Sequence, residues 1–550
     1  MSAPALEIAD DAGCRDLAAA SLLHGGRHPS GLADRRNELG NKGISAAARR
    51  SQLRAGMASS LAPRIGRAAV YERHRPETTA LYEVVSDNLD TLYAAIDDGA
   101  LDVRIPKHAK KELDAFLDCG LLCRGFARLW CAGCNESRLV AFSCKGRGFC
   151  PSCMGRRMCA TSANLIDHVL PEVALRQWVL TFPFAWRRRL AKDGALFADL
   201  TRLFVETVQS FYAKREARRG AKTGSITALQ RTSSDLRLNP HLHALFLDGA
   251  YHEAGGELAW VELPHLRTRE VGDILEHALR RMDKHLRRRG LLDVATANDA
   301  DADHGAADAE DALAASAVSG QTPPAGPQWT RGLPPAPASA LSFDKPLCVS
   351  LDGFTLHAAT RAGSHDLAGR EALLRYALRP PLATDRLETR PDGLVRITLK
   401  RAYADGTLAV DLDPLSLICR LATSVPPPRY HTVKYAGVLA PASPWRARVA
   451  PKPAEPEKAE PEGEPKRGRG GSTYRPWAEL LMRTFGIDVL ECPKCKGRMK
   501  LIAMVTERSS IRRFLTGVGE LVDVPERSPS RGPPYWKSVV MRRKATGDAE

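Results

Sequence analysis

The stretch Asn239-Pro240-His241-Leu242-His243-Ala244-Leu245-Phe246-Leu247-Asp248-Gly249 decides the fold of the region around it. A run of large apolar residues is opened by Asn-Pro and closed by Asp-Gly, so we predict a buried central strand from His241 to Leu247. Side chains alternate faces along a strand, which places His241 and His243 on the same face. Two imidazoles so arranged can hold one metal ion, although such a pair alone also fits ordinary polar residues at a strand end.

The charge of the chain bears on this choice. The 550 residues carry a formal charge of +16 with a pI near 9.4, which favours a nucleic-acid partner, although an arginine-rich composition explains part of the excess. The sixty residues before the pair, 181–240, hold 12 Lys and Arg against 5 Asp and Glu. A paired-histidine metal site beside such a basic segment suits an enzyme that acts on phosphodiesters, where the metal polarises a phosphoryl oxygen.

Cysteine spacing predicts structural zinc. Most of the 13 cysteines lie between Cys119 and Cys159, which indicates a reduced compartment and metal binding rather than a disulfide framework. Two Cys-x2-Cys pairs there predict one tetrahedral zinc site, because each pair supplies two thiolates through a tight turn. The predicted ligands are Cys131, Cys134, Cys150 and Cys153. A further ligand could be Cys144, for which a buried thiol is the alternative.

The cysteine-rich segment is also basic, with Lys and Arg outnumbering acidic residues seven to one between Cys119 and Cys159. A zinc module with this balance is expected to contact DNA phosphates, and a rigid spacer is the alternative. The arginines that we expect at the DNA are Arg147, Arg156 and Arg157.

Composition divides the chain into segments, and its length suggests about three folded domains. We predict disorder at 1–70, where Ala, Gly, Arg and Ser are scattered without a sustained period. We also predict an insertion at 294–340 and a linker at 451–472, because their acidic or proline-rich composition cannot bury a core. Folded parts are expected at 71–165 (helical and zinc-binding), 166–293 and 341–450 (two parts of one catalytic domain) and 473–550 (a small C-terminal module). The last contains Cys492-Pro-Lys-Cys495, which is either half a zinc site that needs ligands from elsewhere or a knuckle without metal.

The order of elements in the catalytic part predicts its class. A strand at 177–182, a helix at 196–214 and adjacent strands at 225–230 and 241–247 outline an α+β domain, in which helices flank an antiparallel sheet. No window approaches eighteen consecutive apolar residues, and the N-terminus is acidic, so we expect neither a membrane span nor a secretory signal.

A helix is predicted near residue 370. Ser364 or Asp366 can cap it, and the proline pair at 380–381 ends it. Its expected buried stripe consists of Leu367, Leu374 and Leu378.

One tyrosine of this helix is a candidate nucleophile. Tyr376 lies about 200° from Leu374 around the helix, so it faces away from the stripe, and it shares its face with Arg379. Arg375 is adjacent. A phenol between guanidinium groups is placed to meet a phosphate, although a structural tyrosine is the alternative.

These motifs together resemble the rolling-circle transposases of the insertion-sequence ninety-one family. The resemblance covers about residues 70–500 apart from the insertion. It rests on the order Cys131-Ala-Gly-Cys134, Ser143-Cys-Lys-Gly-Arg-Gly-Phe-Cys-Pro-Ser-Cys153, Arg176-Gln-Trp-Val-Leu-Thr-Phe-Pro183, Asn239-Pro-His-Leu-His243 with Leu247-Asp-Gly249, Arg375-Tyr-Ala-Leu-Arg-Pro-Pro381 and Val425-Pro-Pro-Pro-Arg429.

The resemblance implies an HUH-type endonuclease fold preceded by a small helical zinc-ribbon module. It implies that His241 and His243 hold Mg²⁺ or Mn²⁺, and that Tyr376 attacks single-stranded DNA at the element ends, giving a 5′-phosphotyrosine link. Members with two catalytic tyrosines carry the second one turn later, where this chain has Pro380, so it resembles the single-tyrosine branch. A cytoplasmic, nucleoid-associated bacterial protein is expected.

The third metal ligand is less clear from the sequence. Gln230, near the end of the neighbouring strand, is the candidate, while Asp248 lies on the opposite strand face from the histidines and ranks lower. Two other functions stay open at this point. One is a plasmid replication initiator or relaxase with the same chemistry, and the other is a zinc-dependent DNA-binding regulator without catalysis.

Overall fold

The computed structural model describes residues 71–531, with gaps at 72, 102, 216–219, 293–313, 315–316, 318–332, 334–337, 401, 404, 452–474 and 486. The predicted extension 1–70, nearly all of the insertion 294–340 and the linker 451–472 therefore lie outside the described residues. In the part that is described, no helix is both long and apolar enough to cross a bilayer.

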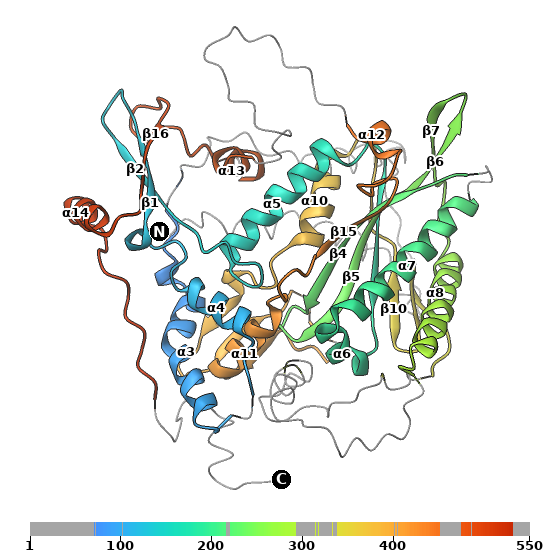
Figure 1. Cartoon of the computed structure of the whole chain (residues 1–550), viewed down its shortest axis with the longest axis horizontal. Coiled ribbons are helices and arrows are strands. Elements are labelled where there is room, and N and C mark those ends of the chain that lie inside the picture. Colours follow the sequence, from blue (N-terminus) through green and yellow to red (C-terminus); the bar gives the residue numbers. More distant parts are fainter. Residues whose placement is uncertain are drawn as a thin grey trace, which may run out of the picture.

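An antiparallel sheet forms the centre of the molecule, and its described residues make eight strands (Figure 1). The strand order is β15-β4-β5-β3-β10-β9-β8, and β11 also pairs with β3. Strand bounds are β3 Leu175–Thr181, β4 Gly224–Thr232, β5 Leu238–Leu247, β8 Ser342–Lys345, β9 Cys348–Leu351, β10 Phe354–His357, β11 Arg361–Ala362 and β15 Val433–Gly437. The predicted central strand is β5, which pairs with β4 on one side and β3 on the other.

Strand β5 begins three residues earlier than expected and includes Asn239 and Pro240. A proline has no backbone N–H to donate to the neighbouring strand, so it is tolerated where the pairing of the two strands is irregular. The pairing of β4 with β5 is irregular at this point. His241 pairs with Gln230 and Leu238 with Thr232, and the register shifts between these two positions. The extra residue lies on β5, where Asn239 and Pro240 together oppose Arg231 of β4, and this bulge lets the turn residues stay within the strand while Gln230 lies directly opposite His241.

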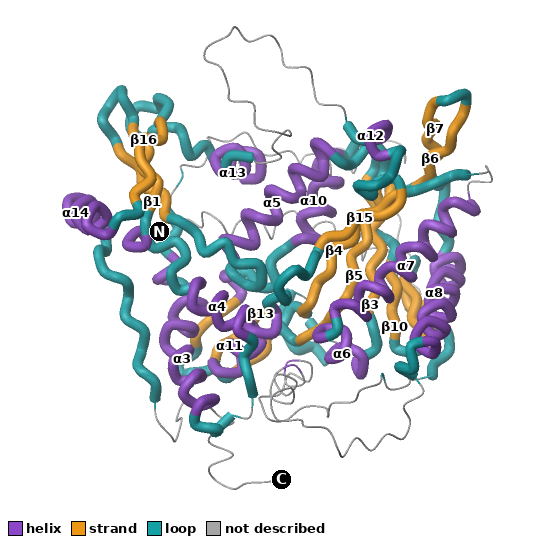
Figure 2. The backbone as a smooth tube through the Cα atoms, viewed as in Figure 1, coloured by secondary structure: helices purple, strands orange, loops and turns teal. Residues whose placement is uncertain are grey.

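Helices cover both faces of the sheet (Figure 2). One face, which includes Trp178, Ala244 and Phe246, packs against α7 and α8. The other face, which includes Ala228 and Leu245, packs against α5 and α10. The bounds of these helices are α5 Pro151–His168, α7 Gly194–Arg215, α8 Thr268–Arg288 and α10 Leu367–Leu378. Alternation along β5 puts the odd-numbered histidines on the face of α5 and α10.

A second hydrophobic core joins the N-terminal helices to residues that the sequence had placed in the catalytic part. The helices α3 and α4 pack with α11 and with a three-stranded sheet in the order β12-β13-β14. Their bounds are α3 Ala80–Asp97, α4 Lys107–Phe116, β12 Leu387–Thr389, β13 Val395–Thr398, β14 Ala409–Leu412 and α11 Pro414–Ser424. Residues 387–424 therefore extend the N-terminal core.

The C-terminal module is joined to the cysteine-rich module. Strand β16 pairs with β1 in a three-stranded sheet of order β16-β1-β2, so the two ends of the described chain share one sheet (Figure 1). The bounds are β1 Phe126–Trp130, β2 Ser137–Ala141, α13 Trp477–Phe485, β16 Lys500–Val505 and α14 Arg508–Val518. Smaller elements are the 3-10 turns at Pro76–Thr78, Leu122–Arg124, Phe184–Trp186 and Thr384–Arg386, with α6 Arg187–Lys192, β6 Gly249–Ala254, β7 Glu257–Glu262 and α12 Arg446–Val449.

Candidate active site and cysteine clusters

The two histidines are buried side by side on the sheet face covered by α5 and α10. His241 and His243 expose 8% and 3% of their surface, and their ring centroids lie 4.9 Å apart. Burial lowers the pKa of His241 to about 4 and holds the pKa of His243 well below its usual value. Both imidazoles are therefore neutral near pH 7, which is the state in which histidine binds a metal.

Hydrogen bonds fix how the rings present their nitrogens. His241 Nδ1 lies 2.7 Å from the carbonyl oxygen of Asn239, so Nδ1 donates and Nε2 keeps its lone pair. The amide nitrogen of Gln177, on β3, lies 2.8 Å from His243 Nδ1. The two ends of an amide are interchangeable in placement, and the orientation with the carbonyl inward leaves the Nε2 lone pair of His243 free.

This arrangement fits a divalent metal. Among the described residues, the Nε2 atom of His243 is buried and has no hydrogen-bond partner. A buried polar atom without a partner costs free energy unless something binds it. Neutral imidazoles whose Nδ1 atoms are engaged by a carbonyl or an amide, with Nε2 available, are the usual arrangement of metal-binding histidines.

The third-ligand candidates have different surroundings. Gln230 lies opposite His241, but its amide nitrogen donates to the carbonyl oxygens of Ala377, at 2.8 Å, and Tyr376, at 3.4 Å. Gln230 thus attaches the end of α10 to β4, and only its carbonyl oxygen remains for a metal. Within the described residues, no His, Cys, Asp or Glu completes a three-ligand group with the histidine pair.

Helix α10 brings Tyr376 to the histidines. The Tyr376 ring contacts the His243 ring edge-on, with centroids 5.6 Å apart, and the Arg379 guanidinium lies 4.4 Å from the centre of the Tyr376 ring. Asp366 caps the helix by accepting a hydrogen bond from the Gly369 amide at 2.8 Å. His243 and Tyr376, 133 positions apart in the sequence, therefore meet at one point, as the family resemblance implies.

The buried stripe of α10 was predicted only in part. Leu374 is fully buried, but Leu367 is 55% exposed because it is the first residue of the helix and lies beyond the sheet. The stripe consists instead of Leu373, Leu374 and Ala377, with Leu378 at its edge. This register still leaves Tyr376 half-buried at the histidines.

A basic cavity opens beside the end of α10. Its volume, counted together with the open solvent at its mouth, is about 880 Å³, and none of the described residues that line it is acidic. Its cationic lining residues are Arg147, Arg231, Arg379, Arg386 and Lys400. Of the five arginines expected at the DNA, two line this cavity, whereas Arg156, Arg157 and Arg375 do not. The cavity meets the histidine pair through Gln230, which lines it as well.

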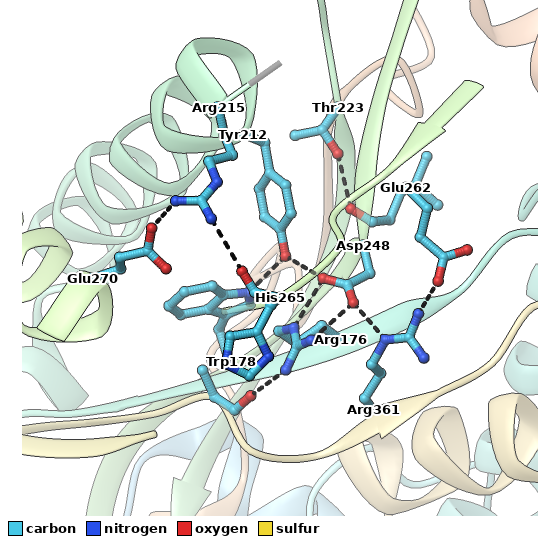
Figure 3. Close-up of polar contacts among 12 residues, drawn as sticks. Arg176, Trp178, Tyr212, Arg215, Thr223, Asp248, Glu262, His265, Glu270 and Arg361 are labelled. Carbon is cyan, nitrogen blue, oxygen red and sulfur yellow. Dashed lines mark hydrogen bonds and ion pairs between the residues drawn. The ribbon is translucent and has the colours of Figure 1, made fainter. Parts of the chain in front are cut away.

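Asp248 belongs to a structural network, in agreement with its low rank as a ligand (Figure 3). Its carboxylate is fully buried and accepts two hydrogen bonds from Arg176, at 2.8 and 2.9 Å. Arg361 Nε donates to it at 2.6 Å and the Tyr212 hydroxyl at 2.9 Å. A carboxylate held this way compensates two guanidinium groups at the end of β5 and has no position left for a metal.

The cysteines form two clusters, so the predicted set of Cys131, Cys134, Cys150 and Cys153 is wrong as a single site. In each cluster the four sulfurs lie within 4.8 Å of one another. One cluster contains Cys119, Cys144, Cys150 and Cys153, and the other contains Cys131, Cys134, Cys492 and Cys495. The physical reason is the β1–β2 hairpin, which turns the first pair away from α5 and toward the C-terminal segment.

Some site residues were missed, and they share a cause. Gln177 reaches His243 only because β3 lies beside β5, and His357 stands on the same face because it pairs with Val179, which pairs with His243. The positive charge that His357 can carry contributes to the lowered pKa of His243. Strand alternation identifies such residues only after the strand order is known. Cys119 could have been identified from the sequence, because it is a further cysteine close to the four that were predicted to complete a zinc site.

Comparison with known families agrees with the geometry. Residues 224–446 match a family model described as "Putative transposase", and residues 91–182 match one described as "Transposase zinc-binding domain" of the insertion-sequence ninety-one type. No curated protein and no solved structure gives a significant match. The first match contains the histidine pair, Tyr376 and most of the cavity lining, and the second contains Arg147 of that lining and the cluster of Cys119, so the protein is a transposase with a zinc-binding domain. On these two matches and the order of its motifs, the chain belongs to the insertion-sequence ninety-one family of transposases.

Proposed function

We propose that this transposase is an HUH-type enzyme of the single-tyrosine branch, which nicks and rejoins single-stranded DNA at element ends and moves its element by a rolling-circle mechanism. The observation that carries the proposal is the meeting of Tyr376 with His243, 5.6 Å between ring centroids, beside a second neutral histidine. A nucleophile and a metal pair at this separation can act on one phosphate.

Charge around the site supports a DNA substrate. Within the described residues, Arg147, Arg231, Arg379 and Arg386 make no ion pair with a carboxylate, although all but Arg379 donate to backbone carbonyls. Uncompensated guanidinium groups in a cavity without acidic lining attract a phosphate backbone. Their proximity to α10 supports a path for the DNA strand next to Tyr376.

The chemistry assigned to the chain's own residues is short. Bound to His241 and His243, Mg²⁺ or Mn²⁺ would polarise the oxygen of the scissile phosphate. The Tyr376 oxygen attacks phosphorus, the bond from phosphorus to the 3′-oxygen breaks, and the phenolic proton is lost while the leaving 3′-oxygen gains one. Arg379, which lies against the Tyr376 ring, favours the phenolate that develops in the attack. The reverse reaction rejoins the strand to a free 3′-hydroxyl.

The test is a cleavage assay on labelled single-stranded oligonucleotides that tile the DNA flanking the gene. We expect metal-dependent release of a fragment with a 3′-hydroxyl and transfer of the other fragment to the protein. Addition of a free 3′-hydroxyl strand should rejoin it. The matched control is the same sequence as a duplex, which should remain uncut. Cleavage that is equal in chelator, or that occurs only on duplex DNA, would overturn the proposal.

A further inference from the structure

The second cysteine cluster joins the two ends of the described chain. Cys134 and Cys492 are 358 residues apart in the sequence, yet their sulfurs lie 3.4 Å from each other, and those of Cys131 and Cys495 also lie 3.4 Å apart. Of these four cysteines, only Cys131 and Cys134 fall inside the stretch that matches the zinc-binding domain model. Cys492 and Cys495 come from the C-terminal segment that supplies β16.

The two Cys-x2-Cys knuckles have the same backbone conformation. In each, the amide four residues after the first cysteine donates to that cysteine's carbonyl, at 2.9 Å from Asn135 and 3.1 Å from Lys496. The amide of the first cysteine donates to the carbonyl oxygen of the residue five positions later, from Cys131 to Glu136 at 2.9 Å and from Cys492 to Gly497 at 2.8 Å. Asn135 and Lys496 both have a left-handed φ, of 59° and 61°.

Such a backbone turns two sulfurs toward one point. A positive φ is costly for a residue with a side chain, and its occurrence at the same place in both turns indicates a geometry imposed by a shared centre. Side-chain space around the sulfurs is limited as well, because a Cβ at Gly133 would lie 3.7 Å from the Cys495 sulfur and one at Gly497 would lie 3.3 Å from it. The two knuckles therefore face each other, with Gly133 next to the Cys495 sulfur of the opposite knuckle and Gly497 next to the same sulfur within its own knuckle.

We propose that Cys131, Cys134, Cys492 and Cys495 bind a second zinc ion, which fastens the C-terminal segment to the N-terminal zinc module. All four sulfurs lie within 4.8 Å of one another, and sulfurs around tetrahedral zinc are about 3.8 Å apart. The cross-pairs at 3.4 Å are too far apart for a disulfide, whose sulfurs lie about 2 Å apart, and too close for four unconnected thiolates. The site is of the closed, structural kind, with four thiolates and no open position.

The fastened segment reaches the helix that carries Tyr376. Helix α13, just before the second knuckle, packs on α5, and its Arg483 pairs with Asp167 of α5 at 2.6 Å and with Glu371 of α10 at 3.3 Å. Strand β16, just after that knuckle, pairs with β1 along its length. The zinc would therefore close a loop of chain that includes the catalytic sheet, and would hold α13 against α5 and α10.

Metal counting on the full-length protein tests the site. We expect two zinc ions per chain in the native protein and one in the Cys492→Ser/Cys495→Ser double variant. The matched control is Cys123→Ser, a cysteine of the same module outside both clusters, which should retain two. Replacing zinc by Co²⁺ should give the absorption of tetrahedral thiolate coordination for both sites, reduced by half in the double variant. Two zinc ions in the double variant, or one in the native protein, would overturn the proposal.

A second measurement does not depend on cysteine variants. A specific protease site is inserted within 455–470, and the purified protein is cut there. The C-terminal fragment should co-elute with the rest of the protein in size-exclusion chromatography while zinc is bound, and should separate after chelation. Because Cys495 is exposed and every cysteine of the other cluster is at least partly covered, we expect this zinc to leave first. A fragment that remains attached after both zinc ions have been removed would overturn the fastening role.

Discussion

Two polar groups at strand β5 are both buried, but they differ in how their hydrogen-bonding capacity is used. Each oxygen of Asp248 accepts two hydrogen bonds, from Arg176, Arg361 and Tyr212. On the opposite face, His243 keeps a buried Nε2 atom that has no partner among the described residues. The first group is complete in the folded chain, and the second is complete only with something bound.

The difference separates a structural role from a catalytic one. A fully paired buried ion group lowers the free energy of the fold relative to any variant that breaks it, because the remaining charge would be left unpaired. An unpaired buried imidazole raises the free energy of the folded state, because it is removed from water without gaining a hydrogen-bond partner. Such a group is retained where it has a role in binding or catalysis. Stability and cleavage should therefore respond oppositely to substitutions on the two faces.

The largest effect is expected on cleavage at the histidine face. His243→Ala should lower the rate of single-strand cleavage by at least about 10³-fold, because the metal contributes several kcal/mol to the transition state. The free energy of unfolding should change by no more than about 2 kcal/mol. Cleavage rate and urea unfolding of the same preparation check this, with DNA affinity as the control for the basic surface. Normal cleavage by His243→Ala would remove the metal pair from the account.

Asp248→Asn should have the reverse profile. Loss of the buried negative charge leaves the buried Arg176 without its carboxylate partner and Arg361 with only the exposed Glu262, so the free energy of unfolding should fall by about 3–5 kcal/mol. Cleavage per folded molecule should stay close to normal. A matched control is Asp199→Asn, which weakens the partly exposed contacts of Asp199 with Arg202, His285 and Arg289 and should cost less than about 1 kcal/mol. Equal stability of the two variants would show that Asp248 is not the support described here.

Acidity should affect the histidine face in the metal-free protein. Burial puts the pKa of His241 at about 4 in the folded state, below the usual value of 6.5 that the unfolded chain keeps. The unfolded state therefore binds the proton first, and stability that is present above pH 6.5 is lost as the pH falls toward 4, by roughly 3 kcal/mol. Urea unfolding without added Mg²⁺ or Mn²⁺ at pH 7 and pH 4.5 measures the loss, which should be smaller in His241→Ala. An equal loss in that variant would assign the acid sensitivity elsewhere.

The smallest effect is expected from the residue that orients His243. Gln177→Ala removes the amide at Nδ1, and loss of such a partner weakens metal binding by about 10- to 100-fold. Gln177→Glu keeps an acceptor at that position and should retain most of the affinity. Titration with Mn²⁺ followed by electron paramagnetic resonance measures both. Equal affinity of Gln177→Ala and the native protein would mean that Gln177 has no role at the site.

The sequence predicted features whose signals are local. The run after Asn239-Pro240 identifies the central strand, the two histidines share a face by alternation, and Asp366 with the proline pair defines the helix of Tyr376. Features that depend on pairing between distant segments were not predictable in this way. The contact of Gln177 with His243 requires the order of β3 and β5, and the partner of Cys131 requires β16 to lie beside β1.

The meeting of Tyr376 with the histidine pair is the central claim, and identification of the DNA-linked residue tests it most directly. Protein is trapped with a cleaved single-stranded end and digested, and the peptide that carries the nucleotide is sequenced by mass spectrometry. We predict one modified peptide, linked through Tyr376, and its loss in Tyr376→Phe, which removes only the nucleophilic oxygen. An adduct that survives in Tyr376→Phe, or that maps to Tyr430 or Tyr435, would contradict the account.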